Sequence, residues 1–122
     1  MSDPKVSTPE LPTEFTVGGR TYDVLSFLEG TESSVSGKVM LERGHAKRAS
    51  MDKEDGEHIL KHAEEIPVAL RGKIVLVFPE WRGSGNPQCV ACLRWGGDRW
   101  VKFWGWLDGS WLGSSRLARH RT

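Results

Sequence analysis

Residues 73–112 read KIVLVFPEWRGSGNPQCVACLRWGGDRWVKFWGWLDGSWL, and this stretch decides the predicted fold. An apolar, largely β-branched run at residues 73–78 is typical of a strand buried on both faces, and Pro79 is expected to end it. Residues 89–95 and 100–107 predict two further strands with a turn between them. Because no helix separates these strands, the sequence predicts an antiparallel meander of three or four strands.

Two helices are predicted upstream of this meander. Ser36 is a suitable N-cap for a helix over residues 38–48. Asp52 can cap a second helix over roughly residues 53–65, whose first turns carry acidic side chains that complement the helix dipole. The apolar stripe of this second helix consists of Ile59, Leu60, Ala63 and Ile66. Pro67 is expected to end it.

The N-terminal part carries a hairpin signal. Gly18-Gly19 lies between two β-prone runs, and both glycines can adopt a positive φ. Pairing across this turn places Val17 opposite Arg20. The predicted fold is therefore α+β, with an N-terminal β-hairpin, two helices, and a three- or four-strand antiparallel meander whose helices pack on one face.

The chain of 122 residues fits one domain. We expect a flexible tail over residues 1–12 and a single α+β domain over residues 13–122. Residues 113–122 are expected to be either an edge strand or a basic tail. No apolar run approaches the ~20 residues that span a bilayer, and the polar start lacks the segments of a signal peptide. We therefore expect a cytoplasmic protein with no membrane partner.

Charge is unevenly distributed along the chain. Residues 1–65 carry a net charge of −5 and residues 66–122 carry +6, whereas the whole chain has a formal net charge of +1. One explanation is that the basic half meets a polyanion. The other, which we favour, is that the two halves attract each other in the fold, because this excess is modest for a dedicated nucleic-acid binder.

Tryptophan is the most unusual feature of the composition, with six residues, five of them between positions 95 and 111. Side chains alternate along the strand at 100–107, so its even-numbered residues share one face. A two-residue turn at Gly97-Asp98 would add Trp95 to this face, and one at Asp108-Gly109 would add Trp111. The candidate interaction surface therefore consists of Trp95, Trp100, Lys102, Trp104, Trp106 and Trp111. A register shift of one residue at either turn would move some of these side chains to the opposite face of the sheet.

These rings could instead form the core, since each can bury ~150–250 Å². The other face of the same strand carries Val101, Phe103 and Leu107, which we expect to be nearly fully buried against Ile59, Leu60 and Ala63. The tryptophan face is expected to keep some solvent contact, because a lysine in the middle of a dry face would need a partner. An open aromatic face of this size would indicate a binding partner.

Other candidate chemistry has weak support. Cys89 and Cys92, together with His58 and His62, are the four side chains of a possible Cys2His2 zinc site. Residues three apart in a strand point to opposite faces, however, so we expect free thiols and no bound metal. The histidines are expected on a solvated helix face. The sequence contains neither GxSxG nor HExxH, and we expect no catalytic residue and no cofactor.

The sequence thus favours a small non-enzymatic domain that binds another protein through part of its tryptophan face. The alternative is a nucleic-acid-binding protein in which the same rings stack on bases. Its phosphate contacts would come from Arg94, Arg99, Arg116, Arg119 and Arg121.

Overall fold

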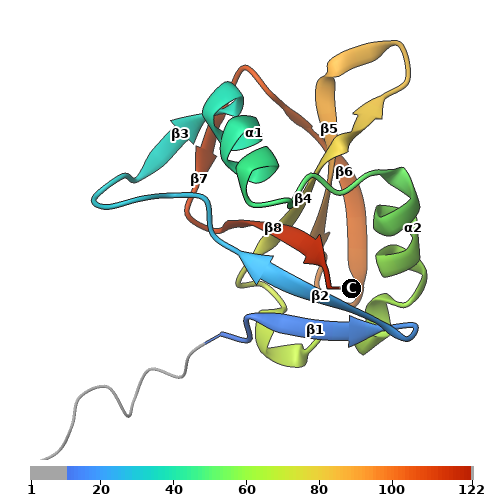
Figure 1. Ribbon diagram of the computed structural model, residues 1–122. Helices are drawn as coiled ribbons and strands as arrows, with labels where there is room; N and C mark the ends of the chain where they lie inside the picture. The colour runs from blue at the N-terminus through green and yellow to red at the C-terminus, as the bar shows by residue number, and fades with distance from the viewer. Residues whose placement is uncertain (1–10, 122) are drawn as a thin grey trace, which may run out of the picture.

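The computed structural model describes residues 11–121, which form a six-stranded sheet, a two-stranded sheet and two α-helices (Figure 1). The strands are β1 (Glu14–Val17), β2 (Arg20–Leu25), β3 (Ser34–Ser36), β4 (Val75–Gly83), β5 (Asn86–Trp95), β6 (Trp100–Trp106), β7 (Ser110–Leu112) and β8 (Ser115–His120). The α-helices are α1 (Gly37–Ala46) and α2 (Lys53–Lys61), and two 3-10 helices follow, η2 (Ala63–Glu65) and η3 (Val68–Leu70). The tail expected over residues 1–12 falls almost wholly outside the described residues.

The strand order of the large sheet is β1-β2-β8-β4-β5-β6. All neighbouring pairs are antiparallel except β4 and β8, which run parallel in the middle of the sheet. The expectation that the chain ends in an edge strand or a basic tail is therefore wrong. Figure 1 shows β8 lying beside β2, so the first and last parts of the chain meet in the sheet.

The helices cover opposite faces of the sheet, which corrects the expectation that they share one face. Ile59 of α2 belongs to a cluster with Leu76 and Leu93. Met40 of α1 belongs to a second cluster on the other face, with Val77 and Cys92. Figure 1 shows α1 and α2 on opposite sides of the sheet. Within residues 11–121, neither helix has the length and apolar character of a membrane span.

The predicted first hairpin and both predicted helix caps are confirmed. Val17 pairs with Arg20 across the first hairpin, whose Gly18 and Gly19 have φ values of 53° and 81°. Ser36 caps α1 by accepting a hydrogen bond from the backbone N–H of Val39 at 3.3 Å. Asp52 caps α2 in the same way.

Pro79 does not end β4, as the sequence suggested. The strand continues to Gly83 through an irregularity between Phe78 and Arg82, where the pairing with β5 shifts register. A bulge of this kind leaves residues unpaired, and the missing N–H of a proline is tolerated there. The chain between Pro79 and Cys89 consequently forms the end of a β4–β5 hairpin, whose tip extends beyond the rest of the sheet (Figure 1).

The residues expected to pack on α2 lie on the opposite face. Leu107 is buried in the α1 cluster, and Phe103 packs against that cluster while remaining half-buried. Val101 is also half-buried. The error came from assigning both helices to one face, because α2 covers the tryptophan side of β6 instead.

Candidate functional site

The register between β5 and β6 brings most of the predicted tryptophan face together. Trp95 pairs with Trp100, as the turn at Gly97-Asp98 predicted. Trp104 and Trp106 pair with Ala91 and Cys89. Because directly opposed residues share a face, the side chains of Trp95, Trp100, Lys102, Trp104 and Trp106 all lie on one side of the sheet.

Trp111 does not belong to this face. It pairs with Val35 in the two-stranded sheet rather than with Trp106, and it is buried in the α1 cluster. Its ring lies over Gly105 on the far side of β6, where a Cβ would be 2.7 Å from the Trp111 ring. The short turn at Asp108-Gly109 therefore carries the chain to the opposite face.

Burial along β6 decreases toward its C-terminal end. Trp100 is 5% exposed and packs in the α2 cluster, whereas Trp104 is 41% exposed and Trp106 is 57% exposed. The prediction that the rings are core is thus correct at one end of the strand. The prediction that they form an open surface is correct at the other end.

Trp81, which is not part of the predicted face, is buried in the α2 cluster and contacts the exposed end. Its ring lies edge-on to Trp104 with a centroid distance of 6.3 Å. The Lys102 ammonium lies 3.7 Å from the Trp104 ring centroid and 5.4 Å from that of Trp81. Both rings therefore face the cation with their negative π surfaces, which explains how a lysine is accommodated between tryptophans.

The bulge in β4 brings Trp81 to this position. Simple alternation from Phe78 would place Trp81 on the opposite face, since the two residues are three apart. The register shift after Phe78 allows both side chains to join the α2 cluster. Sequence reasoning that ended the strand at Pro79 could not place Trp81.

A shallow groove of about 450 Å³ lies between the exposed tryptophans and the β4–β5 hairpin. Its lining consists of Gly83, Ser84, Asn86, Cys89, Trp104 and Trp106. Apart from Cys89 and the residues at the hairpin tip, the walls are aromatic. We call Lys102, Trp104, Trp106 and this groove the open tryptophan surface.

The free edge of β6 borders the open tryptophan surface. Leu107 donates its backbone N–H to Gln88 of β5 at 2.8 Å, and the Arg99 carbonyl accepts from Gly96 at 2.7 Å. Backbone groups alternate in direction along a strand, so those of Trp104 and Trp106 point away from β5. Among the described residues, no strand pairs with this outer side of β6.

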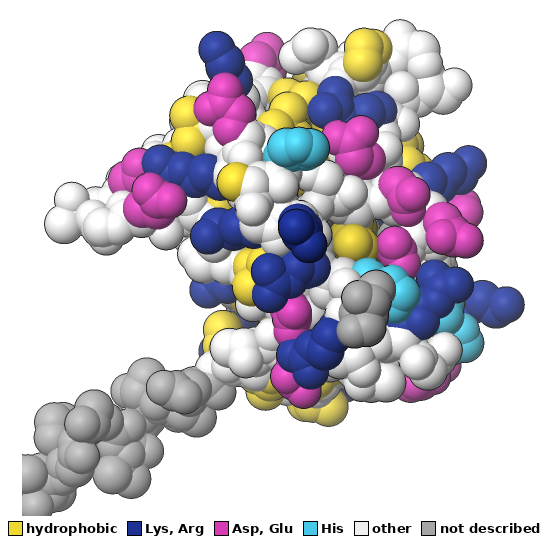
Figure 2. All heavy atoms as spheres, viewed as in Figure 1, with side chains coloured by type: hydrophobic (Ala, Val, Ile, Leu, Met, Phe, Trp, Pro, Cys, Tyr) yellow, Lys and Arg dark blue, Asp and Glu magenta, His cyan; other side chains and the backbone are white. Residues whose placement is uncertain are grey.

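The predicted phosphate contacts do not form one surface. Arg119 donates to Asp23 and to the Lys47 carbonyl, and Arg121 pairs with Glu14 and Asp23. The Arg121 contact is the largest cause that lowers the pKa of Asp23. These pairs join the acidic and basic halves of the chain, as the charge distribution suggested. In Figure 2, basic and acidic side chains alternate over β2 and β8.

The other three arginines lie apart from these two. Arg94 lies over the Phe103 ring at 5.7 Å, on the face away from the open tryptophan surface. Arg116 donates to the carbonyls of Gly113 and Ser115, and its burial lowers the pKa of its guanidinium. Arg99 lies in the β5–β6 turn.

The cysteines and histidines do not assemble the Cys2His2 set. Cys89 and Cys92 are both free and buried, and they occupy opposite faces of β5 because they are three residues apart. Burial raises the pKa of the Cys92 thiol to about 12. The His58 and His62 rings lie 4.8 Å apart with a 53° tilt beside the first hairpin, and His58 Nε2 lies 2.9 Å from the Val17 carbonyl oxygen. Both histidines are half-buried, so the expected solvated face is only partly solvated.

Comparisons of the chain with protein-family models, with curated proteins and with solved structures find no match. The geometry of the open tryptophan surface is therefore the basis for a proposal on function.

Proposed function

We propose that this chain is a non-enzymatic domain that binds another protein at the open tryptophan surface. The observation that carries the proposal is the pair of exposed rings, Trp104 and Trp106, on an unpaired edge strand. Tryptophan is enriched among the residues that dominate binding energy at protein interfaces. Exposed aromatic groups beside an unpaired edge are also an aggregation hazard, which a partner removes.

The partner we propose contributes an extended segment that pairs with the outer side of β6. The outward backbone groups of Trp104 and Trp106 supply the hydrogen bonds of such a strand addition. Alternate side chains of the added strand would then enter the groove beside Cys89 and Asn86. Main-chain pairing supplies affinity in this mode, and the groove supplies specificity.

Site-specific photocrosslinking tests this proposal. A photoreactive phenylalanine derivative, which keeps an aromatic ring, replaces Trp106, which is 57% exposed, and a control carries it at Leu112, which is 56% exposed outside this surface. We expect a discrete product with one polypeptide from position 106 and none from position 112. Excess unlabelled wild-type protein should compete for the product. A W104S/W106S double variant should not compete.

Two matched controls make the result decisive. A V68S/L112S double variant removes the two other large exposed apolar side chains of the described chain and should compete like the wild type. Thermal unfolding of both double variants should show an intact fold, because all four replaced side chains lie at the surface and none belongs to a buried cluster. Identical products from positions 106 and 112, or full competition by W104S/W106S, would contradict the proposal. Binding to oligothymidylate that weakens steeply with salt would support the nucleic-acid alternative instead.

A further inference from the structure

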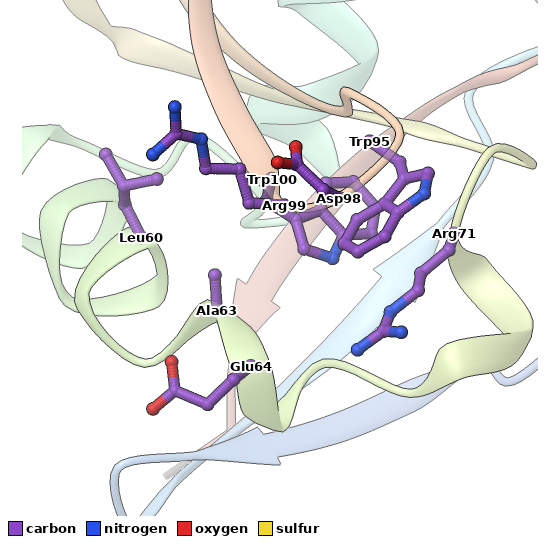
Figure 3. Close-up of a pocket in the computed structure, with 8 residues that line it drawn as sticks. All are labelled: Leu60, Ala63, Glu64, Arg71, Trp95, Asp98, Arg99 and Trp100. Atoms are coloured by element: carbon purple, nitrogen blue, oxygen red, sulfur yellow. The ribbon is translucent and has the colours of Figure 1, made fainter.

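A second site lies at the other end of β6, where η2 and η3 approach the β5–β6 turn. It is a pocket of about 250 Å³, below the ~300–1,000 Å³ usual for drug-sized ligands, so its occupant would be small. Its lining consists of Leu60, Ala63, Glu64, Arg71, Trp95, Asp98, Arg99 and Trp100 (Figure 3). The open tryptophan surface contributes none of these residues.

Two hydrogen-bond donors in this lining are buried without an acceptor in the described chain. They are the Nε1 of Trp100 and the Nε of Arg71. Trp100 is only 5% exposed, and buried donors in folded proteins are nearly always paired. Figure 3 shows the Trp100 indole and the Arg71 guanidinium bordering the space above Ala63 and Glu64. Together they form a donor pair that suits oxygen acceptors.

The guanidinium of Arg71 is held in place by aromatic stacking. Its Cζ lies 4.3 Å from the Trp95 ring centroid, and Trp95 meets Trp100 edge-on at 6.1 Å. Although Glu64 and Asp98 line the same pocket, Arg71 forms no ion pair with a described acidic residue. The cation is thus positioned by packing and keeps its charge available to a ligand.

We propose that this pocket binds a free α-amino acid. The carboxylate would accept from Trp100 Nε1 and Arg71, since a guanidinium matches two carboxylate oxygens. The pocket lining carries two acidic and two basic side chains, so its charges balance, and Glu64 and Asp98 can attract the protonated amine beside that carboxylate. Leu60 and Ala63 supply an apolar wall, which suits an aliphatic side chain.

The test uses three probes of one carbon skeleton: L-leucine, 4-methylpentanoate without the amine, and L-leucinamide without the carboxylate. Each is titrated into ¹⁵N-labelled protein while the indole N–H signals are recorded, with the Trp100 signal assigned by its loss in W100F. We expect leucine to shift the Trp100 signal in a saturable manner and to leave the Trp111 signal in place. The other two probes should bind about tenfold more weakly or worse.

Variants then assign the shift to this pocket. Arg71→Gln should weaken leucine binding about tenfold or more, since a hydrogen bond to a charged group is lost. Arg94→Gln removes an exposed arginine outside the pocket lining and should bind leucine like the wild type. The proposal is overturned if leucine at millimolar concentration leaves the Trp100 signal unmoved, or if leucinamide or 4-methylpentanoate binds as tightly as leucine. The wild-type titration decides the matter even where Arg71→Gln fails to fold.

Discussion

At the residue scale, Gly56 shows how packing can reverse a helix propensity. Glycine inside a helix normally costs about 1 kcal/mol relative to alanine. Gly56 is buried in α2, however, and a Cβ there would lie 2.6 Å from Cζ3 of Trp81. Trp81 is itself enclosed by Phe78 and Trp104 and has little room to move. The glycine therefore sets the distance between α2 and β4.

Gly56→Ala is accordingly expected to destabilise the protein by about 1–2 kcal/mol, because overpacking exceeds the gain in propensity. Gly44→Ala in α1 is the matched control. A Cβ at Gly44 would meet Cδ1 of Leu117 at 3.1 Å, and a small shift of this side-chain end would relieve the contact. Urea unfolding should thus place Gly44→Ala at or above the wild type. A Gly56→Ala variant as stable as Gly44→Ala would refute the packing explanation.

Glu32 carries a pH dependence of stability. Arg43 donates to both of its carboxylate oxygens, and this bonding holds the pKa of Glu32 at about 2, below its ordinary 4.5. A carboxyl group whose pKa is lowered by folding stabilises the protein above pH 4.5. That stability is lost as the pH falls from 4.5 toward 2.

Glu32→Gln should therefore flatten the decline of Tm between pH 4.5 and pH 2. Part of the slope should persist, because the pKa of Asp23 is also lowered by its arginine partners. Glu57→Gln is the control, since Glu57 is exposed and forms no ion pair in the described chain. A slope that Glu32→Gln and Glu57→Gln change alike would contradict this assignment.

At the scale of elements, β8 holds the two halves of the chain together. It pairs with β2 on one side and with β4 on the other. Its neighbouring residues Leu117 and Ala118 are both fully buried, one in each hydrophobic cluster. Together with β4, it occupies the middle of the six-stranded sheet.

Deletion of residues 115–122 is expected to abolish folding, because it removes the ladder hydrogen bonds and both buried side chains at once. Far-UV circular dichroism and amide dispersion in NMR spectra provide the measurement. Deletion of residues 121–122 alone should preserve the fold with a slightly lower Tm, since Arg121 is exposed and contributes surface ion pairs. Cooperative unfolding of the longer deletion would show that β8 is dispensable.

The sequence could predict elements whose geometry is set locally. Gly18-Gly19 determined the first hairpin and its register, and Ser36 and Asp52 determined where the helices begin. The strand order was not predictable in this way, because β8 and β4 are joined by long-range pairing that leaves no local signal. In β8, two arginines flank the buried residues Leu117 and Ala118. This pattern resembles that of a solvated segment, and only the long-range pairing shows that β8 is a central strand.

The candidate site was predictable to a similar extent. Trp95 and Trp100 pair as the turn between them required, and Lys102 lies among the rings as alternation predicted. Trp81 was missed because a bulge changed its face. Arg71 was missed because only the folded chain brings it against Trp95, more than twenty positions away.

At the scale of the whole molecule, one sheet is shared by two hydrophobic clusters. Adjacent residues of the same strand enter different clusters, as Leu76 and Val77 do in β4. Loss of packing in one cluster would therefore disturb strands whose other side chains form the second cluster. The sheet couples the α2 side, with its pocket, to the α1 side, where Trp111 and β7 pack.

This coupling predicts a single cooperative unfolding transition, as is usual for domains of fewer than 150 residues. Trp100 reports on the α2 cluster and Trp111 reports on the α1 cluster, so 5-fluorotryptophan labelling gives each cluster its own ¹⁹F signal. Variants W100F and W111F assign the two signals. In a urea titration, both native signals should disappear with the same midpoint and the same dependence on urea concentration. The Trp111 signal gives the stricter test of cooperativity, because Trp111 lies in the two-stranded sheet, whose strands are short and would be the first to unfold separately. If its native signal were lost at lower urea than that of Trp100, the α1 side would unfold as a separate unit, and the shared sheet would not couple the two faces.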